Sequence, residues 1–312
     1  MDAMKFPISR LLCPLLCTAL LTGAVPSRAS SILFIGNSFT FAYGSPVRYY
    51  RANSVSDFNS DGQGGVPALF KSFASEAGLE YEVFMETWPG VGLDWHLEHK
   101  LAVIGQKPWD NVVMHGYSTL DARQPGNSDL LVRSVKQMSE FLHAKNPAVT
   151  VRLMQTWPRA DLTYLPGGAW YRKPIEAMAG DVRGGYERAA RTPGIEQIIA
   201  VGDAWVRAMH SGVADANPYD GIEAGKLDLW TYDGYHASVY GSYLEALMIF
   251  GSVTALDPRV LGAGECSGFE LGLSSEQVSS LEQVAFDQLA SEGPVKSSPR
   301  VGKSVPARCR AP

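Results

Sequence analysis

One apolar run constrains the fold of this chain more than any other feature. Residues 32–35 are the apolar residues Ile-Leu-Phe-Ile, and the run stops at Gly36-Asn37-Ser38. Such a run is typical of a strand buried on both faces, and such strands belong to parallel sheets covered by helices. In open α/β sheets, ligands bind at the carboxyl ends of the strands. We therefore predict that Ser38 lies at a sheet edge that a ligand can reach.

The rest of the chain alternates between strand and helix patterns, which implies a parallel sheet with helices on both faces. We predict an α/β fold, a three-layer α/β/α sandwich around a mostly parallel five-stranded sheet. The other predicted strands cover residues 80–86, 109–115, 149–155 and 197–201. The predicted helices cover residues 66–77, 93–104, 129–144, 203–210, 239–256 and 274–289, and a further helix ends at Arg191.

The first 29 residues have the pattern of a secretory signal peptide. Lys5 and Arg10 precede an apolar run over residues 11–25, and Ser27-Arg28-Ala29 is a small-x-small cleavage site. The run of about fifteen residues is shorter than the roughly twenty of a membrane span, and Pro14 interrupts it. We expect cleavage after Ala29, a secreted or periplasmic protein, and no stable membrane anchor.

Three further segments follow the signal peptide at residues 1–29. Residues 30–256 hold all the predicted strands and form the α/β domain. Residues 257–290 are a helical extension, and residues 291–312 are a Pro/Ser/Lys-rich tail that we expect to be unstructured.

The charge of the chain restricts its partners. The formal net charge is −5, and cleavage would remove three positive charges and one negative charge, which gives −7. The chain has no basic block and no interleaving of basic and aromatic residues. These features argue against nucleic acid or an anionic membrane as a partner.

The four cysteines indicate at most one disulfide in the mature protein. Cys13 and Cys17 would leave with the signal peptide, so that Cys266 and Cys309 could pair in an oxidising compartment. Two cysteines at this spacing make a poor metal site, and neither has the surroundings of a reactive thiol.

A second polar motif, Asp233-Gly234-Tyr235-His236, lies just before the helix predicted at 239–256. A serine hydroxyl is a poor nucleophile unless a base and an orienting carboxylate activate it. An Asp three residues before a His on a tight turn can accept a hydrogen bond from one ring nitrogen, which leaves the other free to take a proton. The alternative is an ordinary Asx-turn at Asp233, with Ser38 as a turn or helix-cap residue.

These two motifs together resemble the SGNH (GDSL-type) hydrolase superfamily of esterases and lipases. The string Ile-Gly-Asn-Ser-Phe-Thr and the later Asp-Gly-x-His-x-Ser resemble a poorly characterised bacterial branch, and the likeness covers most of residues 32–256. The resemblance implies a flavodoxin-like SGNH hydrolase fold, with Ser38 as nucleophile, His236 as base and Asp233 as orienting acid. It also implies ester hydrolysis through an acyl-enzyme, without a cofactor or a metal.

The resemblance further implies an oxyanion hole. The backbone N–H of Ser38 would be one donor, and the turn Pro89-Gly90-Val91-Gly92 lies where the family has its glycine block. The N–H groups of Gly90 or Gly92 could therefore point at a developing oxyanion. The alternative for these glycines is a flexible turn before a helix.

The third family block departs from its usual pattern. Gly116-Tyr117-Ser118 stands where the family commonly has Gly-x-Asn, so Ser118 takes the place of the amide. A hydroxyl can still donate one hydrogen bond. His115 and Tyr117 are alternative donors in the same turn, and the residues do not decide among the three.

Four loops rich in aromatic residues are expected to determine the substrate. Exposed aromatic rings at a cleft can stack on sugars or line an acyl pocket, whereas buried rings would belong to the core. We expect an ester of an acylated carbohydrate, with a lipid or simple ester as the next candidate; the oligomeric state stays open. The loops are residues 43–65, the turn at Trp88, residues 157–171 with Trp157 and Trp170, and residues 211–230 with Trp230.

Two other functional classes are open to this sequence. A metalloenzyme could start from His96 and His99, which lie three residues apart on a predicted helix, but the His-Glu-x-x-His spacing and a third ligand are missing. A catalytically impaired carbohydrate-binding module would fit the missing asparagine and the long loops. The joint presence of Ser38, Asp233 and His236 favours an enzyme.

Overall fold

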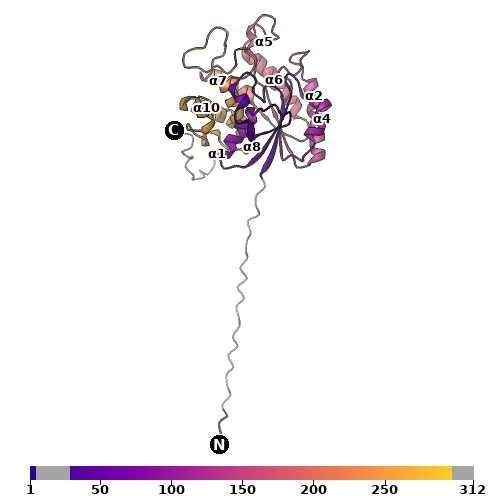
Figure 1. The fold of residues 1–312 in the computed structure, drawn as a ribbon, viewed down its shortest axis with the longest axis vertical. Coiled ribbons are helices and arrows are strands. Elements are labelled where there is room, and N and C mark those ends of the chain that lie inside the picture. Colours follow the sequence, from indigo (N-terminus) through magenta and orange to yellow (C-terminus); the bar gives the residue numbers. More distant parts are fainter. Residues whose placement is uncertain (5–28, 297–312) are drawn as a thin grey trace.

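The computed structural model describes residues 1–4 and 29–296 (Figure 1). Most of the predicted signal peptide and tail fall at residues 5–28 and 297–312, outside the described residues. Cys266 is disulfide-bonded, and its predicted partner Cys309 lies outside the described residues. None of the helices described is both long and apolar enough to cross a bilayer.

One sheet of parallel strands forms the centre of the molecule. Its order is β2-β3-β1-β4-β5-β6, and every neighbouring pair is parallel. Without the short β2, this is the strand order of doubly wound flavodoxin-like folds. The strands are β1 (Ser30–Gly36), β2 (Ser56–Asp57), β3 (Tyr81–Thr87), β4 (Asn111–Met114), β5 (Thr150–Met154) and β6 (Ile195–Ile199).

Helices cover both faces of the sheet. One face carries α1 (Gly65–Glu76), α7 (Val201–His210), α8 (Val239–Thr254) and α10 (Ser275–Glu292). The other carries α2 (Leu93–His99), α3 (Leu101–Ile104), α4 (Asp129–Lys145) and α6 (Ile175–Ala190). The connections hold the short helices α5 (Ala160–Tyr164) and α9 (Cys266–Glu270) and the 3₁₀ turns η1 (Pro46–Tyr49), η2 (Ala52–Ser54) and η3 (Pro258–Val260).

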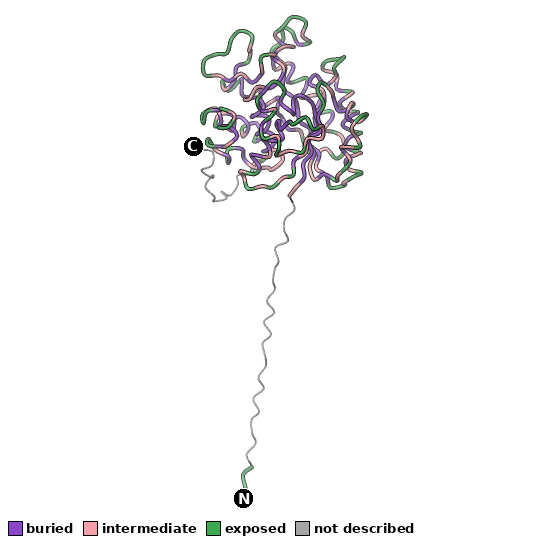
Figure 2. Tube along the Cα trace, in the orientation of Figure 1, coloured by how far each residue is buried: buried purple, intermediate pink, exposed green. Residues whose placement is uncertain are grey.

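Strand β1 divides the core in two, because successive side chains of a strand point to opposite faces. Ile32 and Phe34 belong to the cluster under α1, α7, α8 and α10, whereas Leu33 and Ile35 belong to the cluster under α2, α4 and α6. All four side chains are buried, and Figure 2 shows the buried interior and the exposed outer loops. The apolar run thus forms a strand covered on both faces, as predicted.

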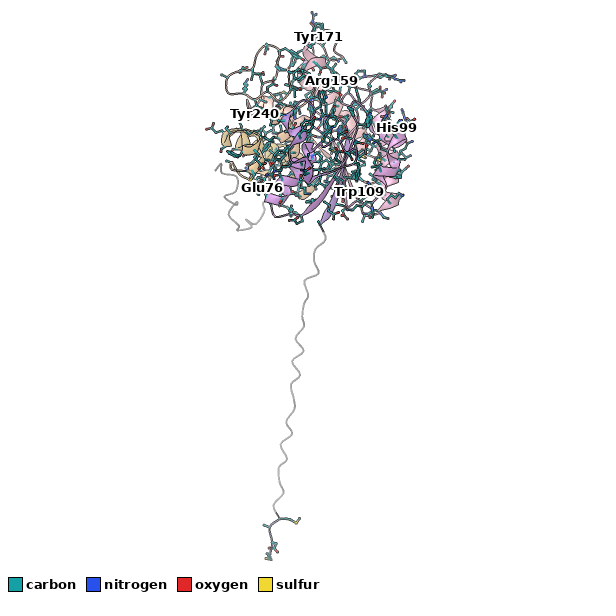
Figure 3. The ribbon with its side chains drawn as sticks, in the orientation of Figure 1. Glu76, His99, Trp109, Arg159, Tyr171 and Tyr240 are labelled. Carbon is teal, nitrogen blue, oxygen red and sulfur yellow. The ribbon has the colours of Figure 1, made fainter. Side chains whose placement is uncertain are left out.

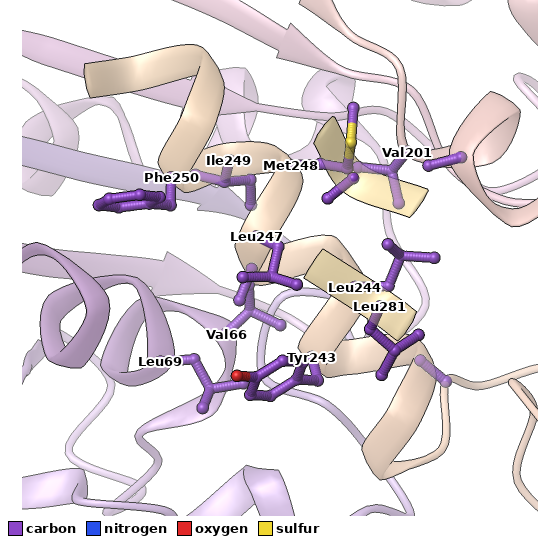
Figure 4. Packing of buried hydrophobic residues seen from close by; sticks show 14 of the residues in the cluster. Val66, Leu69, Val201, Tyr243, Leu244, Leu247, Met248, Ile249, Phe250 and Leu281 are labelled. Carbon is purple, nitrogen blue, oxygen red and sulfur yellow. The ribbon is translucent and has the colours of Figure 1, made fainter. Parts of the chain in front are cut away.

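Helix α8 is apolar on nearly all sides because other helices surround it. Its Leu244 and Leu247 pack among Val66 and Leu69 of α1 and Leu281 of α10 (Figure 4). Helix α8 therefore packs against both α1, early in the chain, and α10, near its end.

The predicted fold class, a three-layer α/β/α sandwich, is confirmed, although the sheet has six strands instead of five. The additional strand, β2, is two residues long and lies inside the predicted loop 43–65. It extends the sheet beyond β3 through the pairs Ser56–Phe84 and Asp57–Met85. So short a strand has no periodic pattern, and only its contact with β3 defines it.

Some predicted helices also differ. The helix predicted at 93–104 is divided at Lys100, which leaves helical geometry (φ −126°, ψ 5°) and directs its ammonium to Asn59 Oδ1 and Glu86 Oε1, 2.7 and 3.3 Å away. The predicted loop 157–171 contains α5. Helix α10 begins with a capping box in which Gln277 is the partner of Ser274.

Candidate active site

The turn after β1 places Ser38 at the carboxyl edge of the sheet, between the neighbouring strands β3 and β4. Asn37 holds this turn, because its Oδ1 accepts a hydrogen bond from Phe39 N (3.0 Å) and its Nδ2 donates to Val91 O (2.8 Å). The first contact fixes the serine turn, and the second ties it to the glycine turn after β3. Ser38 is only 5% exposed, so its hydroxyl lies in a largely buried position.

Gly36 has no room for a side chain. A Cβ at this position would lie 2.2 Å from Thr40 Oγ1 and 2.3 Å from His115 Nε2. The carbonyl of Gly36 accepts hydrogen bonds from Trp88 N (3.1 Å) and His96 Nε2 (2.8 Å). On the other side, His115 N after β4 donates to Ile35 O (3.2 Å), so the end of β1 is fixed from both neighbouring strands.

The structure brings Ser38, His236 and Asp233 into one hydrogen-bonded chain. The Oγ of Ser38 lies 3.0 Å from Nε2 of His236, and Nδ1 of His236 lies 2.7 Å from Oδ2 of Asp233. A carboxylate that accepts the Nδ1–H leaves Nε2 as the proton acceptor, which faces the serine. The arrangement has the geometry of a nucleophile, a base and an orienting acid.

Asp233 is held as a carboxylate. Its Oδ1 accepts from Thr231 Oγ1 (2.8 Å) and from the backbone N–H groups of Tyr235 and His236 (both 2.9 Å). Partial burial acts to raise the pKa of Asp233, but the hydrogen bonds from the His236 side chain and from these donors outweigh it and hold the pKa below its usual range. The group is therefore negatively charged at neutral pH and can stabilise an imidazolium.

The glycine turn lies beside the serine turn. A Cβ on Gly92 would lie 3.3 Å from Tyr117 N, so the turns after β3 and β4 also meet here. Within residues 29–296, the N–H groups of Ser38 and Gly92 have no hydrogen-bond acceptor. Free N–H groups at this edge suit the role of oxyanion donors. Gly90 has a positive φ of 71° and lies at the exposed bend of the turn.

Ser118 is buried in the turn after β4, and its surroundings include a residue that the sequence reading missed. Its Oγ accepts a hydrogen bond from Nη1 of Arg159 (3.3 Å). Arg159 follows β5 and caps α5. No motif pointed to it, since its relation to Ser118 spans 41 residues.

The other two donors considered for this block are placed differently. His115 is buried, and both ring nitrogens are engaged, Nε2 with Thr40 Oγ1 (2.9 Å) and Nδ1 with Gly116 O (2.8 Å). Burial lowers the pKa of His115 to about 4, so its ring is neutral. Tyr117 adjoins Gly92, as described above. The ring of His115 therefore supports the turn and has no free donor for an oxyanion.

The two histidines on α2 have different surroundings, since His96 supports the serine turn and His99 lies at the surface. The side chain of His96 is buried with its Nε2 on Gly36 O, and burial lowers its pKa to about 4. His99 is half exposed and stacks on Trp95, with ring centroids 4.6 Å apart. Among the side chains that the structure describes, no group of three or more His, Cys, Asp or Glu could hold a metal ion.

The aromatic residues of the loops divide into core and surface. Trp157, Trp170 and Trp230 are at most 2% exposed and belong to the core, which is the second of the two alternatives for these rings. Trp88 is 41% exposed. The other exposed aromatic side chains of these loops are the tyrosines Tyr43, Tyr49, Tyr171 and Tyr219, and the exposed Tyr232 follows the last loop.

Tyr43 is the exposed ring nearest to the histidine, because its ring centroid lies 4.8 Å from that of His236. The phenol of Tyr219 approaches the backbone of Asp233 (3.5 Å to its carbonyl oxygen). Exposed tyrosines from two separate loops thus flank the loop that carries the His–Asp pair.

No family model matches this chain, and no curated protein matches it significantly. Among solved structures, a DUF4886 family protein from Bacteroides uniformis has a TM-score of 0.58 and 16% identity, over 86% of this chain and 97% of that one. This likeness shows a shared fold.

Two further structures are more distant. A protein from Slackia heliotrinireducens classed as an SGNH hydrolase has a TM-score of 0.48 and 23% identity, over 72% of this chain and 99% of that one. The lipase/acylhydrolase from Enterococcus faecalis has a TM-score of 0.45 and 17% identity, over 72% and 95%. The structural neighbours thus include the SGNH type that the two motifs resemble, but likenesses this weak carry no argument about activity.

Proposed function

We propose that this protein is a serine hydrolase of the SGNH (GDSL) type that cleaves carboxylic esters through an acyl-enzyme. The observation that carries the proposal is the chain of contacts from Ser38 Oγ to His236 Nε2 (3.0 Å) and from His236 Nδ1 to Asp233 Oδ2 (2.7 Å). These three side chains have the order and polarity that convert a serine into a nucleophile.

In the proposed mechanism, His236 takes the proton of Ser38 as the serine oxygen attacks the ester carbonyl carbon. The tetrahedral oxyanion receives hydrogen bonds from the free N–H groups of Ser38 and Gly92. The imidazolium, stabilised by Asp233, then gives its proton to the departing alcohol. Water repeats the sequence on the acyl-enzyme and releases the acid. None of these steps needs a metal or a cofactor.

We further propose that the substrate is an ester of an acylated carbohydrate and that the protein acts after secretion. The support for the sugar is the set of exposed Tyr and Trp rings in the loops around Ser38, since such rings offer an apolar face and a polar edge. The support for secretion is the pattern of the first 29 residues.

The test is covalent labelling and ester turnover by the mature protein. A fluorophosphonate should label the wild type, and p-nitrophenyl acetate should be hydrolysed; Ser38→Ala should abolish both, because the serine oxygen forms the bond to the acyl group. Ser134→Ala is the matched control, since Ser134 on α4 is equally buried (4% against 5% exposed). Retained activity in Ser38→Ala would refute the serine mechanism.

A panel of esters then distinguishes the substrate classes. Acetylated sugars should be better substrates than long-chain esters, judged by kcat/KM. Preference for long acyl chains would make the protein a lipase or simple esterase. Binding to a polysaccharide without turnover of any ester would make it a binding module.

A further inference from the structure

The guanidinium of Arg159 joins three loops of the candidate site. Its Nε and Nη2 donate to the two carboxylate oxygens of Asp161 (3.0 and 2.6 Å), and its Nη1 donates to Ser118 Oγ (3.3 Å). Its central carbon lies 3.5 Å from the ring centroid of Tyr235, the residue before His236. Figure 3 shows Arg159 toward the end of the molecule at which α5 lies, opposite the end where the chain enters β1.

These contacts restrict what Ser118 can do. A hydroxyl has one proton to donate and lone pairs with which to accept. Because Ser118 Oγ accepts from a cation, its own O–H is free to donate elsewhere and becomes a stronger donor.

The loops are also held together independently of this contact. Asp161 N donates to Gly234 O (3.1 Å), and Trp157 Nε1 donates to Tyr235 O (3.0 Å). The segment after β5 is therefore attached to the loop of the base even without the guanidinium. The turn after β4 is attached too, because Thr156 Oγ1 donates to Ser118 O (3.4 Å). The link from Arg159 to Ser118 Oγ therefore acts chiefly on the orientation of one hydroxyl.

We propose that Ser118 donates a hydrogen bond to the oxyanion during ester cleavage and that Arg159 is the positioning residue that orients and polarises its hydroxyl. The inference rests on the proposed function. When the serine oxygen bonds to the carbonyl carbon, the carbonyl electron pair moves onto oxygen, and the Ser118 O–H donates to that charge without transferring its proton. Ser118 with Arg159 thereby replaces the asparagine amide of the third block.

The experiment measures kcat and KM for p-nitrophenyl acetate in single and double variants. Ser118→Ala should lower kcat on the order of a hundredfold, the usual effect of losing one oxyanion donor. Arg159→Lys keeps the positive charge beside Asp161 but loses the planar fork that reaches Ser118. It should lower kcat by about tenfold, with KM changed by less than about twofold, because the lost interaction exists only in the transition state.

The double variant separates positioning from general structural support. If Arg159 acts through Ser118, Ser118→Ala/Arg159→Lys should have the same kcat as Ser118→Ala, since the hydroxyl to be oriented is gone. The assignment would be overturned if kcat of the double variant fell below that of Ser118→Ala by the same factor that Arg159→Lys causes alone. A second readout is the affinity for a trifluoromethyl ketone, which binds as an oxyanion adduct. This affinity should fall by the same factor as kcat in each variant.

The chain supplies a matched control in Arg259→Lys. Arg259 makes the same forked contact with an aspartate two residues away, Asp257, and lies 3.3 Å from the ring centroid of Phe286, remote from Ser38. This variant should leave kcat unchanged. Unchanged kcat in Ser118→Ala would overturn this inference alone, whereas an active Ser38→Ala would overturn the proposed function and this inference with it.

Discussion

At the scale of single residues, Asp233 has two tasks that its two oxygens divide between them. Oδ1 accepts from three donors of its own turn, and Oδ2 accepts from His236 Nδ1. The first task shapes the loop, and the second orients the imidazole. A substitution that keeps one oxygen and replaces the other can separate the two.

Asp233→Asn should therefore lower kcat far more than it lowers stability. The amide oxygen can keep the contacts of Oδ1, but an NH₂ group cannot accept from His236 Nδ1–H, so the ring takes the wrong tautomer. We expect kcat to fall on the order of a thousandfold or more. Thermal unfolding measured beside the kinetics should change little.

Asp233→Ala provides the contrast. Removing both oxygens also leaves the turn donors without their acceptor, which costs about 1–3 kcal/mol for a buried group. Equal loss of stability in the Asn and Ala variants would contradict this division of tasks.

At the scale of elements, helices α1, α8 and α10 and the start of α9 meet around buried carboxyl groups. These groups are the carboxyls of Glu76 of α1, Glu282 of α10 and Glu265 at the cap of α9, and they interact electrostatically. Tyr243 of α8 donates to Glu265 Oε2 (2.7 Å). Burial, with the neighbouring Glu265, raises the pKa of Glu76 and that of Glu282 to about 8. The positive charge of Arg51 acts to lower the pKa of Glu76 but does not outweigh burial.

These raised pKa values predict that stability falls as pH rises. In the unfolded chain both carboxyls lose their protons near their ordinary pKa of 4.5, whereas the folded protein keeps them to about pH 8. The contribution of these two carboxyls to the free energy of unfolding is therefore complete below about pH 4.5 and is lost as pH rises to about 8. Urea unfolding at pH 5, 6, 7 and 8 should show this decline.

Glu282→Gln should make the decline shallower, because the amide cannot ionise. Glu276→Gln, near the start of the same helix and exposed, should leave the slope as it is. If stability falls with pH as steeply in Glu282→Gln as in the wild type, the assignment of the decline to this cluster is wrong.

At the scale of the whole molecule, the last helix shares the core of the central sheet. Leu281 of α10 is fully buried in the cluster that contains Phe34 of β1 and Leu247 of α8. The residues beyond 256 therefore stabilise the sheet that carries the candidate site, although their own sequence has no catalytic motif.

Leu281→Ala should destabilise the whole fold by about 2–5 kcal/mol, the usual cost of a cavity in a core. Because Trp157, Trp205 and Trp230 lie in the same cluster, tryptophan fluorescence and far-ultraviolet circular dichroism should shift together in urea unfolding. Leu165→Ala, at an exposed leucine, should change stability by less than about 0.5 kcal/mol. A fluorescence midpoint that stays at its wild-type value would show that α10 is an independent unit.

Much of this architecture followed from local patterns. The run at residues 32–35 predicted a strand buried on both faces, and the alternation of patterns predicted the layers, because side-chain burial has a period along each element. The turn from Asp233 to His236 predicted a hydrogen bond within four residues, which the structure contains. Boundaries were accurate where a pattern was long, as in α4, and failed for β2 and α5, which are too short to have one.

The sequence by itself determined the strand and helix types, the serine turn and the Asp–His pair, since each depends on residues close together in the chain. Only the tertiary structure decided that Ser38 and His236, 198 positions apart, are in contact, that three of the four loop tryptophans are core residues, and that Arg159 reaches Ser118. The physical reason is that such contacts depend on the order of strands in the sheet and on side-chain packing, and neither leaves a periodic signal along the chain.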